Sequence, residues 1–486
     1  MSARHRFLTG LRAGLLAPLL AMVVSVLPAQ AQHEQHEQHN AGTAKRRPPP
    51  LAMGAAFAPD GALWVVALDA QQRLFVMTSA DEGRSWTAPR TLDTGADKIA
   101  ADGENRPKLV FDPQGWAVIT YTEPLSKPYT GQIRMLRSVD GGRSFSAPFT
   151  VHLDRQLITH RFESVAFDAR GTLHTAWVDK RDLEAQASAP TLAGASDPSA
   201  STPGGASVAN SGEAKPNRPT RSPMRSLTRK KSDYLGAAIY RNESTDGGLT
   251  FGPDIKLADH SCECCRIALA PAPDGSLVAL WRHVFAPNQR DHGFASIGRE
   301  PTAPAVATAA PVEPVRATFD RWAIDACPHH GPGLAPAMGA AVGAAVSAAV
   351  SAAAAAGAGA GSATAGAGGY HAVWFGQRAG DARVRYGQLN ADGSPRGDVR
   401  VLPDERAEHA GVASVGAKVA IAWRSFDGQA TLWRAWVSVD DGHSFALKEL
   451  GRSASDNDHP LLAQRGEQIF ALWRTAEGVR VERLFP

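Results

Sequence analysis

An apolar segment with alternating residues returns seven times along this chain, and this repeat restricts the fold more than any other feature of the sequence. Five copies end in Trp and one in Tyr, whereas the first copy lacks the terminal aromatic residue. The copies are Ala62–Leu68, Trp116–Tyr121, Leu173–Trp177, Leu277–Trp281, Tyr370–Trp374, Val419–Trp423 and Ile469–Trp473. Alternation with a period of two predicts β-strands. Apart from the insertions, the spacing of about 50–60 residues leaves room for four short strands in each repeat.

A second repeat, Ser-x-Asp-x-Gly-x-Ser/Thr-Phe/Trp, occurs four times, each time at the expected turn between the third and fourth strands. Its copies are Ser79–Trp86, Ser138–Phe145, Ser244–Phe251 and Ser438–Phe445. The aspartate can accept backbone N–H groups across the turn, and the glycine can adopt a positive φ. The motif therefore predicts a rigid turn that joins two strands.

Four-stranded units repeated around an axis make a β-propeller. The second repeat is the Asp-box, or BNR, motif, and over residues 51–486 the chain resembles the sialidase-like β-propellers. The resemblance implies an all-β fold, a six- or seven-bladed β-propeller of four-stranded antiparallel blades. Family sialidases have six blades, whereas this chain has six full units and a shorter seventh from His459 to Pro486, so both counts stay open. The Asp-box aspartates are expected to be structural, at the outer rim: Asp81, Asp140, Asp246 and Asp440.

Residues 1–31 have the organisation of a Sec-type export signal. Three arginines precede an apolar stretch from Ala13 to Leu27, and Ala29-Gln30-Ala31 resembles a cleavage site. Residues 32–50 form a His-rich tail that we expect to be disordered. Low-complexity insertions are expected at 187–231 and 335–369. We therefore expect a periplasmic or secreted protein with no membrane span after removal of the signal.

Composition excludes several classes of protein. With 43% hydrophobic residues, 20% charged residues and a mean hydropathy of −0.22, the chain is neither a polytopic membrane protein nor mostly disordered. Without the three signal arginines, basic and acidic residues are equal in number. We therefore expect no nucleic-acid partner, and no motif points to a nucleotide or a flavin. The oligomeric state is not indicated.

Histidines and cysteines recur just before the first strand of several repeats. In a propeller these positions lie on one face, around the central channel, where ligands usually bind. The predicted metal-binding residues are His160, Cys262, Cys264, Cys265, Cys327, His329, His330, His409 and His459. Imidazoles and thiolates that converge on one channel favour copper or zinc. The alternative for the cysteines is a disulfide, with Cys327 paired to one of the other three.

Three arginines follow second strands on the same face: Arg282, Arg424 and Arg474. They could bind an anionic substrate, as a sialidase requires, or they could be structural. The Arg-Ile-Pro motif of family sialidases is not in the sequence, and we assign no catalytic residue. The sequence thus favours a propeller that binds a metal ion in its funnel for metal handling. The alternatives are a divergent exo-α-sialidase-type glycoside hydrolase acting on sialylated glycans and a scaffold that binds protein or glycan.

Overall fold

A computed structural model describes residues 50–101, 104–188, 236–298, 312–324, 328–337 and 368–486. The expected signal, the His-rich tail, most of both insertions and Cys327 lie outside these residues. In the described part, the regular secondary structure consists of β-strands and one helix, α2 (Arg181–Ser188). None of its helices is long and apolar enough to cross a membrane.

The strands follow one another as antiparallel units, numbered 1 to 7 along the chain. Unit 1 comprises β1 (Met53–Phe57), β2 (Leu63–Leu68), β3 (Leu74–Ser79) and β4 (Arg90–Thr91). Unit 2 comprises β5 (Lys108–Phe111), β6 (Ala117–Pro124), β7 (Gly131–Ser138) and β8 (Phe149–Thr150). Unit 3 comprises β9 (His160–Phe167), β10 (Leu173–Asp179), β11 (Ala237–Ser244) and β12 (Ile255–Ser261).

The second half of the chain repeats the same arrangement. Unit 4 comprises β13 (Ala268–Pro271), β14 (Leu277–Phe285), β15 (Gln289–Ile297) and β16 (Val315–Arg316), and it joins unit 3 at the pair Ser261 and His283. Unit 5 comprises β17 (Gly333–Pro336), β18 (Gly369–Arg378), β19 (Asp381–Asn390) and β20 (Pro395–Val401). Unit 6 comprises β21 (Glu408–Val415), β22 (Lys418–Phe426), β23 (Thr431–Ser438) and β24 (Ala446–Ser453). Unit 7 has three strands, β25 (Leu461–Arg465), β26 (Gln468–Thr475) and β27 (Gly478–Arg483). The predicted all-β architecture of four-stranded antiparallel sheets is confirmed.

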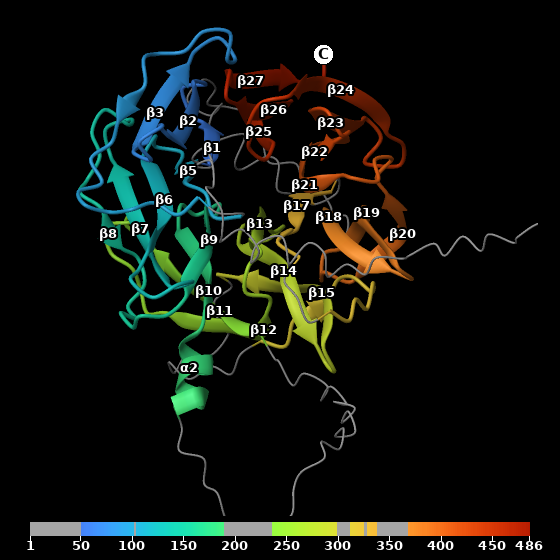
Figure 1. Ribbon diagram of the computed structural model, residues 1–486, viewed down its shortest axis with the longest axis horizontal. Helices are drawn as coiled ribbons and strands as arrows, with labels where there is room; N and C mark the ends of the chain where they lie inside the picture. Colours follow the sequence, from blue (N-terminus) through green and yellow to red (C-terminus); the bar gives the residue numbers. More distant parts are fainter. Residues whose placement is uncertain (1–49, 102–103, 189–235, 299–311, 325–327, 338–367) are drawn as a thin grey trace, which may run out of the picture. The chain divides into compact units, whose positions relative to one another are not determined.

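The first strands of the units surround a common centre (Figure 1). In chain order they are β1, β5, β9, β13, β17, β21 and β25, and each contacts the next. The last of them, β25, contacts β1. The segments that lead into these strands can therefore approach one another although they are far apart in the sequence. We call them the leading loops.

The aromatic residues that end the second strands pack between neighbouring units. Trp177 of unit 3 lies in an apolar cluster with Val118 and Ile133 of unit 2. Likewise, Trp423 of unit 6 packs with Val373 of unit 5. Both indole rings are fully buried. The recurring tryptophan is thus explained by the interface between units, where a large apolar side chain removes much surface from water.

The Asp-box turns have the expected hydrogen bonds. In the first box, Asp81 accepts the backbone N–H of Ser85 at 2.8 Å and its hydroxyl at 2.6 Å, while Ser79 donates to Asp81 at 2.8 Å. The three other boxes repeat this pattern. These bonds lower the pKa of Asp81 to about 2, because they favour the charged carboxylate.

A glycine in each Asp box also packs against the preceding unit. Gly142 of unit 2 has a φ of 78°, and a β-carbon there would overlap the Trp64 ring of unit 1. The equivalent Gly83 of unit 1 lies against Val481 of unit 7 in the same way. The motif therefore joins neighbouring units, including the last to the first, as well as two strands within a unit.

We predict that Gly142→Ala destabilises the protein by about 1–3 kcal/mol more than Gly141→Ala, because only the first substitution overpacks a neighbouring ring. Gly141 is the matched control, since its φ of 71° is equally unfavourable for alanine but no atom lies near its missing β-carbon. Urea unfolding of both variants measures the difference. Equal losses would contradict the packing role.

The third Asp box predicts a pH-dependent contribution to stability. Burial opposes ionisation of Asp246, but hydrogen bonds from Ser244 and Thr250 outweigh it and lower its pKa to about 2. Since the unfolded pKa is about 3.9, this contribution is fully present above about pH 4 and is lost as the pH falls to about 2. Asp246→Asn should therefore lower the melting temperature at pH 6, and the gap to the wild type should shrink toward pH 2. A gap independent of pH would refute this assignment.

Candidate metal centre

Three predicted histidines come together as a stack of rings: His330 and His459 from the leading loops of units 5 and 7, and His409 from the start of β21. The rings of His330 and His409 are 4.5 Å apart, and those of His409 and His459 are 3.4 Å apart. Phe375 covers the other face of His330 at 4.5 Å. These three imidazoles meet although they are up to 129 residues apart in the sequence. The repeat predicted that these three residues would lie close together.

A local irregularity of β21 orients the middle ring. In the pairing of β21 with β22, Glu408 lies opposite Arg424, and the next paired residue, Gly411, lies opposite Ala422. Between these pairs, His409 has a φ of 51°, in the left-handed region that non-glycine residues rarely adopt. A bulge of this kind redirects a side chain away from the regular alternation of a strand.

Glu104 joins this stack, although the sequence analysis did not identify it. Its side chain is 2% exposed. One carboxylate oxygen accepts from Arg266 at 2.6 Å, and the other lies 2.9 Å from Nδ1 of His409. Burial opposes ionisation of this group, but the charges of Arg266, His409 and Arg106 outweigh it and hold the pKa of Glu104 well below its usual value. The residue leads into β5, which is the same place in unit 2 that the histidines occupy in theirs.

The outer two imidazoles are neutral. Burial, together with the charge of His409, holds the pKa of both His330 and His459 well below the usual value. The Nδ1 atom of His459 is buried and has no hydrogen-bond partner among the described residues. A neutral imidazole with an available lone pair is the form that binds metal ions.

Two overlapping sets of side chains have the proximity that a metal site needs. One atom from each of Glu104, His409 and His459 lies within 4.8 Å of the others, and the same is true of His330, Glu408 and His409. A carboxylate that holds Nδ1 of a histidine leaves Nε2 of that ring as the ligand atom, a common arrangement around protein metals. The stack can therefore offer nitrogen ligands that Glu104 orients.

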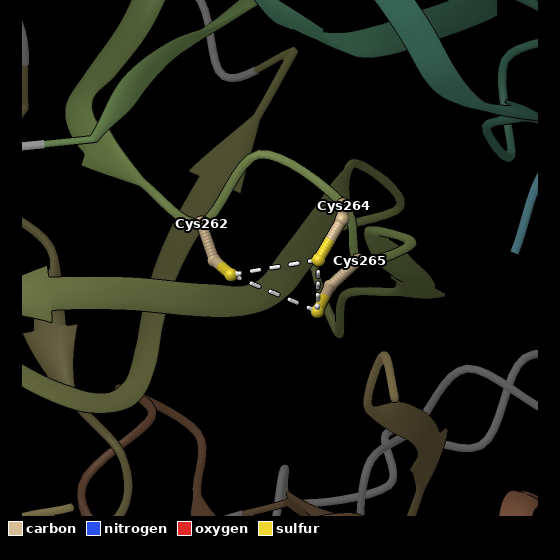
Figure 2. A group of neighbouring side chains, drawn as sticks. All are labelled: Cys262, Cys264 and Cys265. Atoms are coloured by element: carbon tan, nitrogen blue, oxygen red, sulfur yellow. Dashed lines mark hydrogen bonds between the residues drawn. The ribbon is translucent and has the colours of Figure 1, made fainter. Parts of the chain in front are cut away.

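The cysteines form a separate group in the leading loop of unit 4. The Sγ atoms of Cys262, Cys264 and Cys265 point toward one another and are 3.9 Å apart in each pair (Figure 2). All three side chains are buried, and Cys262 and Cys265 are not in a disulfide. The hydrogen bond from Cys265, together with Arg290 and Arg282, lowers the pKa of Cys262 to about 6 against the opposing effect of burial. Cys327 lies outside the described residues.

One predicted ligand, His160, lies in another group of rings. His160 stacks on His152 at 4.0 Å, and its Nε2 lies 3.3 Å from a carboxylate oxygen of Asp154. His329 is exposed to solvent next to the half-buried His330, and its role as a ligand stays a prediction. The expectation that all of these side chains surround one point is therefore wrong for His160, and the thiols form a group of their own.

The three predicted anion-binding arginines donate to backbone carbonyls of the next unit. Arg282 donates to the carbonyl of Phe375 at 2.6 Å, and Arg474 donates to that of Leu68 at 2.7 Å. Arg424 donates to the carbonyl of Asn457 at 3.0 Å and also to Glu408. These contacts favour the structural alternative over a common anion clamp.

Comparison with known proteins gave structural matches only. No protein-family model and no curated protein matches the chain. A polysaccharide lyase, an ulvanlyase, is similar at 10% identity over 89% of this chain and 92% of its own, with a TM-score of 0.47. A Hadza microbial sialidase is similar at 13% identity over 88% and 75% of the two chains, with a TM-score of 0.41. An α-L-arabinanase from Penicillium chrysogenum is similar at 10% identity over 90% and 93%, with a TM-score of 0.41.

A sialidase is thus among the similar structures. Identities and TM-scores this low assign no activity to the chain.

We predict that Glu104→Gln lowers the free energy of unfolding by about 2–3 kcal/mol, because it leaves Arg266 without its charged partner beside the buried stack. Glu408→Gln is the control, because its pair with Arg424 is partly exposed and its loss should cost less than about 1 kcal/mol. Urea unfolding of the two variants gives both values. Similar losses would show that Glu104 does not stabilise the centre.

Proposed function

We propose that this chain is an exported, seven-bladed β-propeller whose central site binds a transition-metal ion through His330, His409 and His459, with Glu104 beside them. The observation that carries the proposal is the approach of Glu104, His409 and His459 within 4.8 Å, with Glu104 buried and the two histidines half-buried. The blade count rests on the seven first strands and on the contact of β25 with β1. Export rests on the sequence of residues 1–31.

The chemistry of the site supports copper or zinc. Imidazole binds Cu, Zn and Ni well, whereas Mg and Ca prefer sites made of oxygen atoms. Neutral His330 and His459 need not lose a proton before they bind. Arg266 and Arg106 offset the charge of Glu104, so the bound ion need not neutralise this carboxylate alone. The proposed role is binding of the ion, for metal handling.

The glycoside-hydrolase alternative remains a prediction from the family resemblance. The guanidinium groups of Arg282, Arg424 and Arg474 contact backbone carbonyls, which does not favour a sialidase-like substrate clamp.

We also propose a disulfide between Cys264 and Cys327. Among the described cysteines, Cys262 and Cys265 are not in a disulfide, which leaves Cys264 as the partner for Cys327. Export to an oxidising compartment would permit this bond.

Metal binding is tested with the full chain, purified without an affinity tag, by calorimetric titration with Zn²⁺ and Cu²⁺. Because His33, His36 and His39 could also bind metal, all variants carry alanine at these three positions. We expect the wild type to bind one equivalent of metal, and we expect His409→Ala and His459→Ala to lose this binding. Glu104→Gln should weaken binding about 10–100-fold, as the loss of an outer carboxylate typically does.

His443→Ala is the control, because this exposed histidine lies in an Asp-box turn away from the stack. His409→Gln is a second variant that keeps the size of the side chain. Circular dichroism checks that each variant is folded. Equal metal content in folded wild type, His409→Gln and His459→Ala would refute the proposal and leave the stack a structural feature.

A further inference from the structure

The thiol group of unit 4 has a geometry that suits a metal ion of its own. Its three sulfur atoms form a triangle with sides of 3.9 Å. The centre of such a triangle lies about 2.3 Å from each sulfur, which is the usual length of a metal–thiolate bond.

The surroundings of the group select a soft ion. The cysteines lie in an apolar cluster with Phe162, Ala176 and Trp281. The neighbouring Glu263 forms an ion pair with Lys180, and among the described residues the set of close donor atoms contains only sulfur. A buried site with thiolates as its only donors favours Cu(I) over the harder ions that imidazole and carboxylate also accept.

A buried arginine independently points to negative charge at this place. The side chain of Arg282 is 1% exposed, and its hydrogen bonds go to two backbone carbonyls rather than to a carboxylate. Its Nε and Nη1 atoms have no hydrogen-bond partner among the described residues. The charge of this guanidinium acts on both Cys262 and Cys265. A buried cation without a carboxylate is stabilised by a nearby anion, and three thiolates around a monovalent ion carry a net negative charge.

We propose that Cys262, Cys264 and Cys265 form a second metal site, separate from the histidine stack, that binds Cu(I) when Cys264 is reduced. This site extends the proposed function, and the part that concerns Cys264 rests on the disulfide proposed above. An external dithiol would reduce that disulfide: its two sulfurs become a disulfide, and Cys264 and Cys327 each gain one electron and one proton. Binding of Cu(I) then displaces the thiol protons.

The step gives the site a dependence on redox conditions. With Cys264 oxidised, only Cys262 and Cys265 remain as donors, and two thiolates hold the ion less well than three. The affinity for Cu(I) should therefore be at least about tenfold higher after reduction.

The test is competition for Cu(I) between the full chain and a coloured Cu(I) chelator, without oxygen, before and after treatment with a dithiol. The chain carries alanine at His33, His36 and His39. We expect one Cu(I) on the reduced protein, with an ultraviolet thiolate-to-metal band, and its loss in Cys262→Ser and Cys265→Ser. Cys327→Ser should give the high affinity without reduction, because it frees Cys264.

His409→Gln separates the two proposals, because it should keep the Cu(I) site whatever it does to the histidine stack. If the cysteine variants do not fold, X-ray absorption of Cu(I) on the reduced wild type still decides the matter. Three sulfur neighbours at about 2.3 Å support the site. A first shell of nitrogen, or unchanged Cu(I) binding in folded Cys262→Ser, overturns it. Equal affinities before and after reduction refute the redox dependence.

Discussion

Closure between the last unit and the first is the constraint on which the rest of the molecule depends. Strand β25 contacts β1, and Arg474 donates from β26 to the carbonyl of Leu68 at 2.7 Å. Glu82 of the first Asp box forms ion pairs with Arg465 and Arg483 of unit 7. Because of this closure, Glu104 and His459 meet although 355 residues separate them in the sequence. An open row of the same units would leave these groups apart, and no shared site could form.

The sequence was sufficient for the features that repeat. Alternating apolar segments, the terminal tryptophans and the Asp boxes each depend on short-range patterns, and each has the predicted place in the fold. The stack of His330, His409 and His459 could also be predicted, since equivalent positions in a repeat occupy equivalent places around an axis. The sequence leaves the blade number open, because a short last unit can either close the ring or complete another sheet.

Side-chain direction could not be predicted in the same way. His160 stands at a comparable position to His409, yet it packs on His152 beside Asp154. His409 is turned by the bulge of β21, and nothing in the local sequence signals that bulge. The role of Glu104 could not be predicted, because nothing in the sequence distinguishes one glutamate in a polar loop from many others. The positions of Arg282, Arg424 and Arg474 could be predicted from the repeat, but their hydrogen-bond partners could not. A guanidinium group binds a backbone carbonyl as readily as an anion.

The three-stranded sheet of unit 7 has a mechanical implication. In the described chain, the seam between this sheet and unit 1 is held by side-chain contacts and by the packing of β25 on β1, with no backbone ladder across it. Most other neighbouring units also lack such a ladder, but the chain runs directly from each of those units to the next. The seam between unit 7 and unit 1 has no such connection, so it is where the ring would open first. Glu104 and His459 belong to the units on either side of unit 1. Opening of this seam would move Glu104 and His459 apart, so an ion bound between them would stabilise the closed ring.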